Sequence, residues 1–228
     1  MTLFLDAVGT LFGLRETPGH LYARIAKRHR IQVEPDVLDK HFGPTWKGSP
    51  PPDYASASDA AARERIDQAW WKSIVRETFR LSGASPQEAA FDACFDEIFQ
   101  LYGTAAPWKV YPETLAVLPR LRDEGHRLVV LSNFDQRLES VMTALKLRQL
   151  VDEVLYSSNL GACKPSPEAF ARALAQSGSA RETTLHVGDD PETDGKGAVA
   201  AGLHFFHIQR PEIDLHDLES HLRESPLN

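Results

Sequence analysis

The stretch "TLFLDAVGTLFG" (residues 2–13) decides the fold, because it joins a buried strand to an acid and a tight turn. Its apolar run ends at a single carboxylate, Asp6, and Gly9 and Thr10 follow at once. In parallel sheets, side chains at strand ends of this kind face ligands. We therefore expect Asp6 to be a functional group. A second carboxylate could share the site two residues further on, but that position is Val8.

Four more apolar runs repeat the strand pattern at 127–131, 153–157, 183–187 and 203–208. They are dense rather than alternating, which is typical of parallel strands that are covered on both faces. Segments with helical periodicity lie between them, such as "QRLESVMTALKL" (136–147) and "SPEAFARALAQSG" (166–178). These strand–helix units predict an α/β fold, a Rossmann-like doubly wound parallel sheet.

Residues 14–106 interrupt this rhythm. Helical patterns occur near 18–30, 34–42, 61–82 and 86–102, without a convincing strand. The segment "GPTWKGSPPPDYASAS" (43–58) is rich in Pro, Gly and Ser, which predicts a long loop. We therefore predict an inserted all-helical cap subdomain at 14–106, and an α/β core made of 1–13 and 107–228.

Composition and charge narrow the possible partners. The chain has 228 residues and a net charge of −7, which disfavours nucleic acid as a partner. No apolar run reaches the roughly 18 residues of a membrane-spanning helix. No basic segment precedes the first apolar run, so no signal peptide is expected. Two cysteines are too few for a disulfide framework and suit a reducing compartment. We expect a cytoplasmic protein, either a monomer or a homodimer.

Polar side chains gather where the predicted strands end. Ligands of open α/β sheets bind beyond the carboxyl ends of the strands. Those ends carry Asp6, Ser132, Asn133, Lys164, Asp189, Asp190 and Asp194. An acid, a hydroxyl, an ammonium and an acidic cluster on one rim form the strongest functional signal in the chain. His186 lies inside an apolar strand, so we expect it to be a core residue.

Four motifs in order link these positions to a known family. They are "DAVGTLF" (6–12), Ser132 in "VVLSNFD", Lys164 in "KPSPEAF", and "HVGDDPETD" (186–194). The set resembles the haloacid dehalogenase (HAD) superfamily, in particular the branch with a helical cap after the first motif. The run "SNFDQRLE" (132–139) is similar to the domain-containing-3 type of HAD-like hydrolases. The resemblance covers essentially the whole chain.

The resemblance implies a hydrolase that acts on a small phosphorylated metabolite. Asp6 would attack phosphorus and form an aspartyl-phosphate, a form of covalent carboxylate catalysis. Mg²⁺ would be the cofactor, since it prefers oxygen ligands. Asp6, the main-chain carbonyl of Val8 and Asp189 would hold it, and Asp194 would orient a bound water.

The resemblance also implies how the substrate is bound. Ser132 and the start of the following helix would receive phosphate oxygens, since free N–H groups favour an anion there. Asn133 and Thr10 are further substrate-binding candidates. Lys164 would bind substrate and balance the charges of phosphate and Asp6 as the transition state forms.

Val8 departs from the family pattern, because phosphatases of this family usually carry a second aspartate there. That aspartate protonates the leaving oxygen, a contribution worth about 10²–10⁴-fold in rate. The 2-haloacid dehalogenases also lack it, because halide leaves without a proton, but they lack the acidic pair kept here at Asp189 and Asp194. Phosphonatases depend on a cap lysine, and none stands out here. A catalytically weakened binding module is a third possibility. The acidic fourth motif favours the metal-dependent phosphatase.

Overall fold

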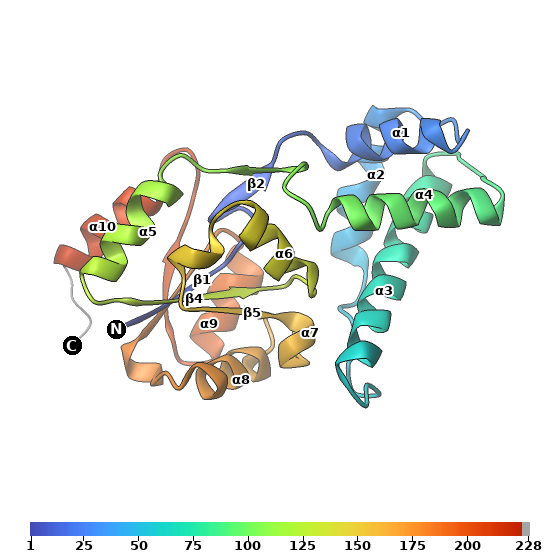
Figure 1. Ribbon diagram of the computed structural model, residues 1–228. Helices are drawn as coiled ribbons and strands as arrows, with labels where there is room; N and C mark the ends of the chain where they lie inside the picture. The colour runs from blue at the N-terminus through green and yellow to red at the C-terminus, as the bar shows by residue number, and fades with distance from the viewer. Residues whose placement is uncertain (225–228) are drawn as a thin grey trace. The chain divides into compact units, whose positions relative to one another are not determined.

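A five-stranded parallel sheet forms the centre of the computed structural model, which describes residues 1–224. The strands are β1 (Thr2–Leu5), β4 (Arg127–Ser132), β5 (Glu153–Tyr156), β6 (Thr184–Gly188) and β7 (His204–His207). Their order is β5-β4-β1-β6-β7, so the chain crosses over on both sides of β1 (Figure 1). The predicted α/β doubly wound fold is confirmed.

The register of the sheet brings the polar strand ends to one edge. Leu5 pairs with Val130 on one side and with Val187 on the other, all in parallel. Parallel strands end at the same edge, so the residues that follow them in the chain meet there. Asp6 is therefore placed between the ends of β4 and β6.

Helices cover both faces of this sheet. They are α5 (Thr114–Asp123), α6 (Arg137–Ala144), α7 (Ser157–Leu160), α8 (Pro167–Ser177), α9 (Gly197–Ala200) and α10 (Leu215–Glu224). Short helical turns complete the unit: η1 (Arg148–Leu150), η2 (Arg181–Thr183) and η3 (Pro191–Lys196). Phe170 of α8 and Ala198 of α9 belong to one hydrophobic cluster with Phe4 of β1. Helices α5 and α10 pack against each other (Figure 1).

The inserted segment is a helical unit that spans residues 14–107, whereas residues 1–13 and 108–224 belong to the sheet unit. Its helices are α1 (Pro18–Arg28), α2 (Pro35–Gly48), α3 (Ala60–Leu81) and α4 (Glu88–Leu101). Leu21, Ile25, Phe79 and Phe95 belong to its own hydrophobic core. Across residues 1–224, no helix is long and apolar enough to cross a membrane.

Two local predictions differ from the structure. Helix α2 continues through Pro44 to Gly48, so the predicted loop at 43–58 begins too early. An internal proline removes one helix hydrogen bond, but Phe42 just before it packs edge-on against Tyr22 and supports the helix. A two-stranded sheet of β2 (Phe12–Leu14) and β3 (Trp108–Val110) was not predicted, because three-residue strands carry too little periodicity.

Candidate active site

Asp6 lies at the carboxyl edge of the sheet, directly after β1. Its backbone N–H donates to the carbonyl of Val187 at 2.8 Å, so the parallel ladder still holds it in place. Its side chain is buried, and its Oδ1 accepts a hydrogen bond from Lys164 Nζ at 2.7 Å. The backbone therefore fixes the carboxylate, and a buried cation orients it.

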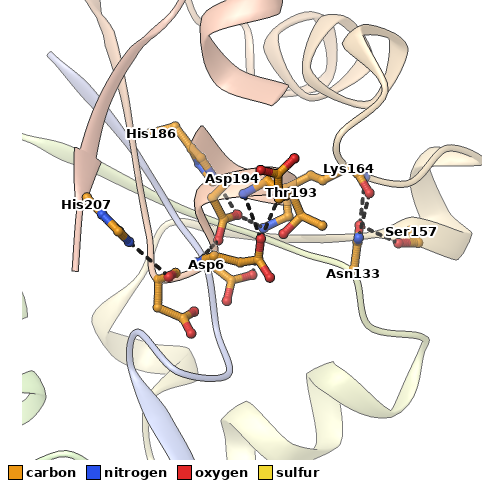
Figure 2. Close-up of polar contacts among 11 residues, drawn as sticks. Asp6, Asn133, Ser157, Lys164, His186, Thr193, Asp194 and His207 are labelled. Atoms are coloured by element: carbon orange, nitrogen blue, oxygen red, sulfur yellow. Dashed lines mark hydrogen bonds and ion pairs between the residues drawn. The ribbon is translucent and has the colours of Figure 1, made fainter. Parts of the chain in front are cut away.

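Lys164 joins the first and fourth motifs. Its Nζ also lies 2.5 Å from Asp194 Oδ1, and the lysine is only 4% exposed (Figure 2). Burial by itself would lower the pKa of Lys164, but the charges of Asp194 and Asp6 raise it above its ordinary value. The ammonium thus stays charged and bridges two carboxylates.

The two bridged carboxylates differ in proton affinity. Burial raises the pKa of Asp6 from 3.8 to about 7; Lys164 opposes this, and the nearby Asp194 and Asp189 add to it. Burial acts in the same direction on Asp194, but Lys164 and His186 hold the pKa of Asp194 below its ordinary value. A proton in this cluster at neutral pH therefore resides on Asp6.

Gly9 and Gly188 make room for the acidic cluster. Gly9 has a φ of +94°, and a Cβ built there would lie 2.3 Å from the Asp189 carboxylate. A Cβ at Gly188 would lie 2.3 Å from the Asp194 carboxylate. Only glycine lets the backbone approach these acids so closely.

The fourth motif folds back on itself to return Asp194 to the site. Asp190 Oδ1 accepts from the N–H groups of Glu192 and Thr193 at 2.8 and 2.9 Å, which caps η3. Within this turn the N–H of Asp190 donates to Asp194 Oδ2 at 3.2 Å. Asp190 therefore shapes the loop, whereas Asp189 and Asp194 face the site.

His186 supports Asp194 from inside the sheet. It is fully buried on β6, and its Nε2 lies 2.8 Å from Asp194 Oδ1 (Figure 2). Burial lowers the pKa of His186, so the neutral ring donates through Nε2 to the ionised carboxylate. The sequence indicated a core residue, and its contact with Asp194 was missed because Asp194 lies beyond the end of β6, in η3, which folds back over the strand.

Asn133 holds the backbone of Lys164 with both ends of its amide. Its Oδ1 accepts from Lys164 N–H at 2.7 Å, and its Nδ2 donates to the Lys164 carbonyl at 2.7 Å. Ser157 Oγ donates to the same Oδ1 at 3.3 Å (Figure 2). The predicted substrate-binding amide thus positions the lysine.

The remaining substrate-binding candidates are placed differently. Ser132 ends β4 next to the Asp6 strand and is 5% exposed. Thr10 is fully buried, so a substrate has no access to its hydroxyl. The N–H of Arg137 at the start of α6 donates to Asp135 Oδ1 at 3.1 Å. This one amide is occupied by a side chain of the chain itself, and phosphate binding at Ser132 and the start of α6 stays a prediction.

The three acids form one oxygen-ligand cluster. One carboxylate oxygen from each of Asp6, Asp189 and Asp194 lies within 4.8 Å of the other two. With all three carboxylates ionised, the cluster including Lys164 would carry a net charge of −2, and a proton on Asp6 reduces this charge when no cation is bound. Hard divalent cations prefer such oxygen donors, so the donor set fits one. Val8 is half-buried beside this cluster, and its side chain has no proton to transfer.

The comparisons with known proteins agree with this geometry. Residues 1–202 match the model of a hydrolase family, the haloacid dehalogenase-like hydrolases. The chain belongs to this family. It is 32% identical over 222 residues to the mouse "Haloacid dehalogenase-like hydrolase domain-containing protein 3", which covers 96% of this chain and 84% of that protein. The predicted family, and the prediction of a hydrolase, are confirmed.

Solved structures share the fold at lower identity. A HAD phosphatase from Thermococcus onnurineus has a TM-score of 0.64 and 19% identity, covering 97% of both chains. The putative HAD-hydrolase YfnB from Bacillus subtilis, solved bound to magnesium, has a TM-score of 0.67 and 16% identity, covering 97% of this chain and 98% of that one. The L-2-haloacid dehalogenase from Xanthobacter autotrophicus with chloropropionic acid covalently bound has a TM-score of 0.65 and 17% identity. The match covers 100% of this chain and 84% of that one. These structures show the fold alone.

Proposed function

We propose that this HAD-like hydrolase is a Mg²⁺-dependent phosphatase acting on a small phosphorylated metabolite through an aspartyl-phosphate at Asp6. One observation carries the proposal. Three carboxylates, Asp6, Asp189 and Asp194, lie close together, and the buried ammonium of Lys164 pairs with two of them, Asp6 and Asp194. Asp6 and Asp194 are buried and Asp189 is exposed at the edge of the cluster, so a divalent cation that reaches the cluster from solvent would balance its excess negative charge. A reaction without a metal needs no such third carboxylate.

The proposed Mg²⁺ ligands are the carboxylates of Asp6 and Asp189 and the main-chain carbonyl of Val8. Asp194 is engaged on both oxygens, by Lys164 and His186 at Oδ1 and by the Asp190 N–H at Oδ2. It therefore acts in orienting a bound water. The cation, when bound, neutralises charge on the phosphate and on Asp6.

Asp6, Lys164 and Ser132 have different roles in the proposed phosphoryl transfer. An oxygen of ionised Asp6 attacks phosphorus, and the bond from phosphorus to the leaving oxygen breaks with its electron pair. Lys164, fixed by Asn133, balances the negative charge that spreads over the phosphoryl oxygens. Ser132 donates a hydrogen bond to one of those oxygens. Water then attacks the phosphorus of the aspartyl-phosphate, which releases phosphate and restores Asp6.

Val8 sets the preference for leaving groups. Position 8, two residues after Asp6, is a valine and carries no acid to protonate the leaving oxygen, so departing groups must be stable as anions or take a proton from water. Aryl and acyl phosphates satisfy this condition, and simple alkyl phosphates do not. We propose that the helical unit at residues 14–107 is a cap that selects among such substrates.

The test is a hydrolysis screen over a panel of phosphorylated metabolites, with and without Mg²⁺, in which 2-chloropropionate is included. The proposal expects phosphate release that requires Mg²⁺, and no chloride release. Chloride release without metal would instead support a 2-haloacid dehalogenase, the second candidate, which Val8 favours. No turnover of any compound would support a binding module.

A further inference from the structure

A partly buried arginine outside the four motifs contacts the turn that follows Asp6. Beyond β7 the chain turns back on itself, and Gln209 and Ile213 exchange two backbone hydrogen bonds of 3.0 and 2.9 Å. This closed loop carries Arg210, whose side chain is 20% exposed. Arg210 is thus carried by a loop that is closed by backbone hydrogen bonds, and its charged side chain is mostly shielded from solvent.

Arg210 donates to two consecutive carbonyls of the first motif. Its Nε donates to the Gly9 carbonyl at 3.2 Å, and its Nη2 donates to the Thr10 carbonyl at 2.7 Å. These carbonyls belong to the turn in which the Leu11 N–H donates to the Ala7 carbonyl. A charged donor therefore fixes the turn from outside.

Two side chains after β3 hold the guanidinium in this orientation. Arg210 Nη1 pairs with Glu113, whose side chain is 8% exposed. The guanidinium carbon lies 3.8 Å from the centroid of the Tyr111 ring, a cation–π contact. Both partners belong to the sheet unit. A planar fork can serve two carbonyls, a carboxylate and a ring at once, which an ammonium cannot.

The fixed turn reaches the proposed metal site through Gly9. A Cβ on Gly9 would collide with the Asp189 carboxylate, so the two groups already touch. Val8, whose carbonyl is a proposed ligand, precedes Gly9. The same C-terminal segment also contacts the other side of the cluster, since His207 Nε2 donates to the Asp189 carbonyl at 3.1 Å (Figure 2).

We infer that Arg210 is a positioning residue, which holds the 7–12 turn so that the Val8 carbonyl and Asp189 keep their places around Asp6. Its action on the turn is independent of any metal. Its consequence for Mg²⁺ rests on the proposed function.

Hydrogen exchange of the metal-free protein tests the inference, with Arg210→Met, Arg210→Lys and a control, Arg120→Met. Arg120 makes a two-bond pair with Glu219 at 2.6 and 2.8 Å in the same unit, away from the first motif. In Arg210→Met the peptide that covers residues 7–12 should exchange about 10-fold faster or more, because a charge-assisted bond is lost. Peptides of β4 provide the internal reference for global stability.

The control should leave exchange of the turn within about two-fold of wild type. Unchanged exchange in Arg210→Met, or wild-type protection in Arg210→Lys, would overturn the role assigned to the guanidinium. Calorimetry then measures Mg²⁺ binding, which we expect to weaken about 10-fold in Arg210→Met only. Wild type that binds no Mg²⁺ would refute the proposed function, while the exchange result would still decide on Arg210.

Discussion

At the scale of single residues, the sequence could predict side chains that follow the strands of the sheet, but not side chains that contact distant backbone groups. Asp6, Lys164, Asp189 and Asp194 could be predicted to meet, because each follows a strand of one parallel sheet. The roles of Asn133 and Arg210 could not. Asn133 contacts the backbone of a residue 31 positions away, and Arg210 contacts carbonyls about 200 positions away. Every residue has a backbone carbonyl, so the sequence does not indicate which of these carbonyls a side chain will contact.

Val8 provides the sharpest prediction at this scale. Wild type should hydrolyse aryl phosphates far better than alkyl phosphates, and Val8→Asp should raise alkyl-phosphate turnover by some part of the ~10²–10⁴-fold that proton transfer supplies. The half-buried setting of Val8 leaves the new acid partly solvated, although a buried carboxyl has a raised pKa. Steady-state kinetics on one substrate of each kind checks this. Equal rates on both substrates in wild type, together with no gain in the variant, would refute this account of Val8.

The titration of Asp6 gives a pH prediction. The folded, metal-free protein keeps a proton on Asp6 up to about pH 7, whereas an unfolded chain releases it near 3.8. This contribution to stability is therefore complete below 3.8 and is lost as the pH rises through 7, by at most about 1.4 kcal/mol per unit. His186, whose pKa is lowered, changes the stability in the opposite direction with pH. The contribution of Asp6 must therefore be measured as a difference between wild type and a variant without this carboxylate.

The measurement compares urea unfolding of wild type and Asp6→Asn in EDTA at several pH values. The free energy of unfolding of wild type, relative to the variant, should fall between pH 4 and 7. Saturating Mg²⁺ should flatten this dependence, since the cation replaces the proton. A difference that does not change with pH would contradict the raised pKa of Asp6.

At the scale of elements, long dense strands and amphipathic helices were predictable, and short ones were not. The runs at 2–6, 127–131 and 183–187 became β1, β4 and β6 within one or two residues. The three-residue strands β2 and β3 pair with each other across the whole inserted unit, so nothing local in the sequence indicates them. Helix α2 passes Pro44 because tertiary packing outweighs a local breaker.

The turn after β1 yields a prediction with a matched control. Gly9→Ala places a methyl group on the Asp189 carboxylate and strains a φ of +94°. Gly125→Ala imposes a similar strain, at a φ of +85°, with no atom within 4 Å. Both should lose about 1–2 kcal/mol of stability from backbone strain, and only Gly9→Ala should also lose Mg²⁺ affinity. Thermal unfolding and calorimetric titration separate the two effects. Equal Mg²⁺ affinities in the two variants would show that the contact between Gly9 and Asp189 is unimportant.

At the scale of the whole molecule, the sheet unit carries every residue of the candidate site. The helical unit has a hydrophobic core of its own, which includes Ile25, Phe79 and Phe95. Such an arrangement lets the sequence of the helical unit vary without disturbing the catalytic groups. Substrate choice is therefore the property least readable from the four motifs, whereas the hydrolase family can be read from them.

The central claim is that Asp6 is phosphorylated with the help of Mg²⁺. Beryllofluoride forms a stable mimic of an aspartyl-phosphate, and ¹⁹F NMR detects it when it is bound to the protein. We expect bound fluorine resonances in wild type when Mg²⁺ is present, and none after EDTA or in a folded Asp6→Asn protein. Bound resonances that persist in Asp6→Asn, or their absence from wild type at saturating Mg²⁺, would contradict the account.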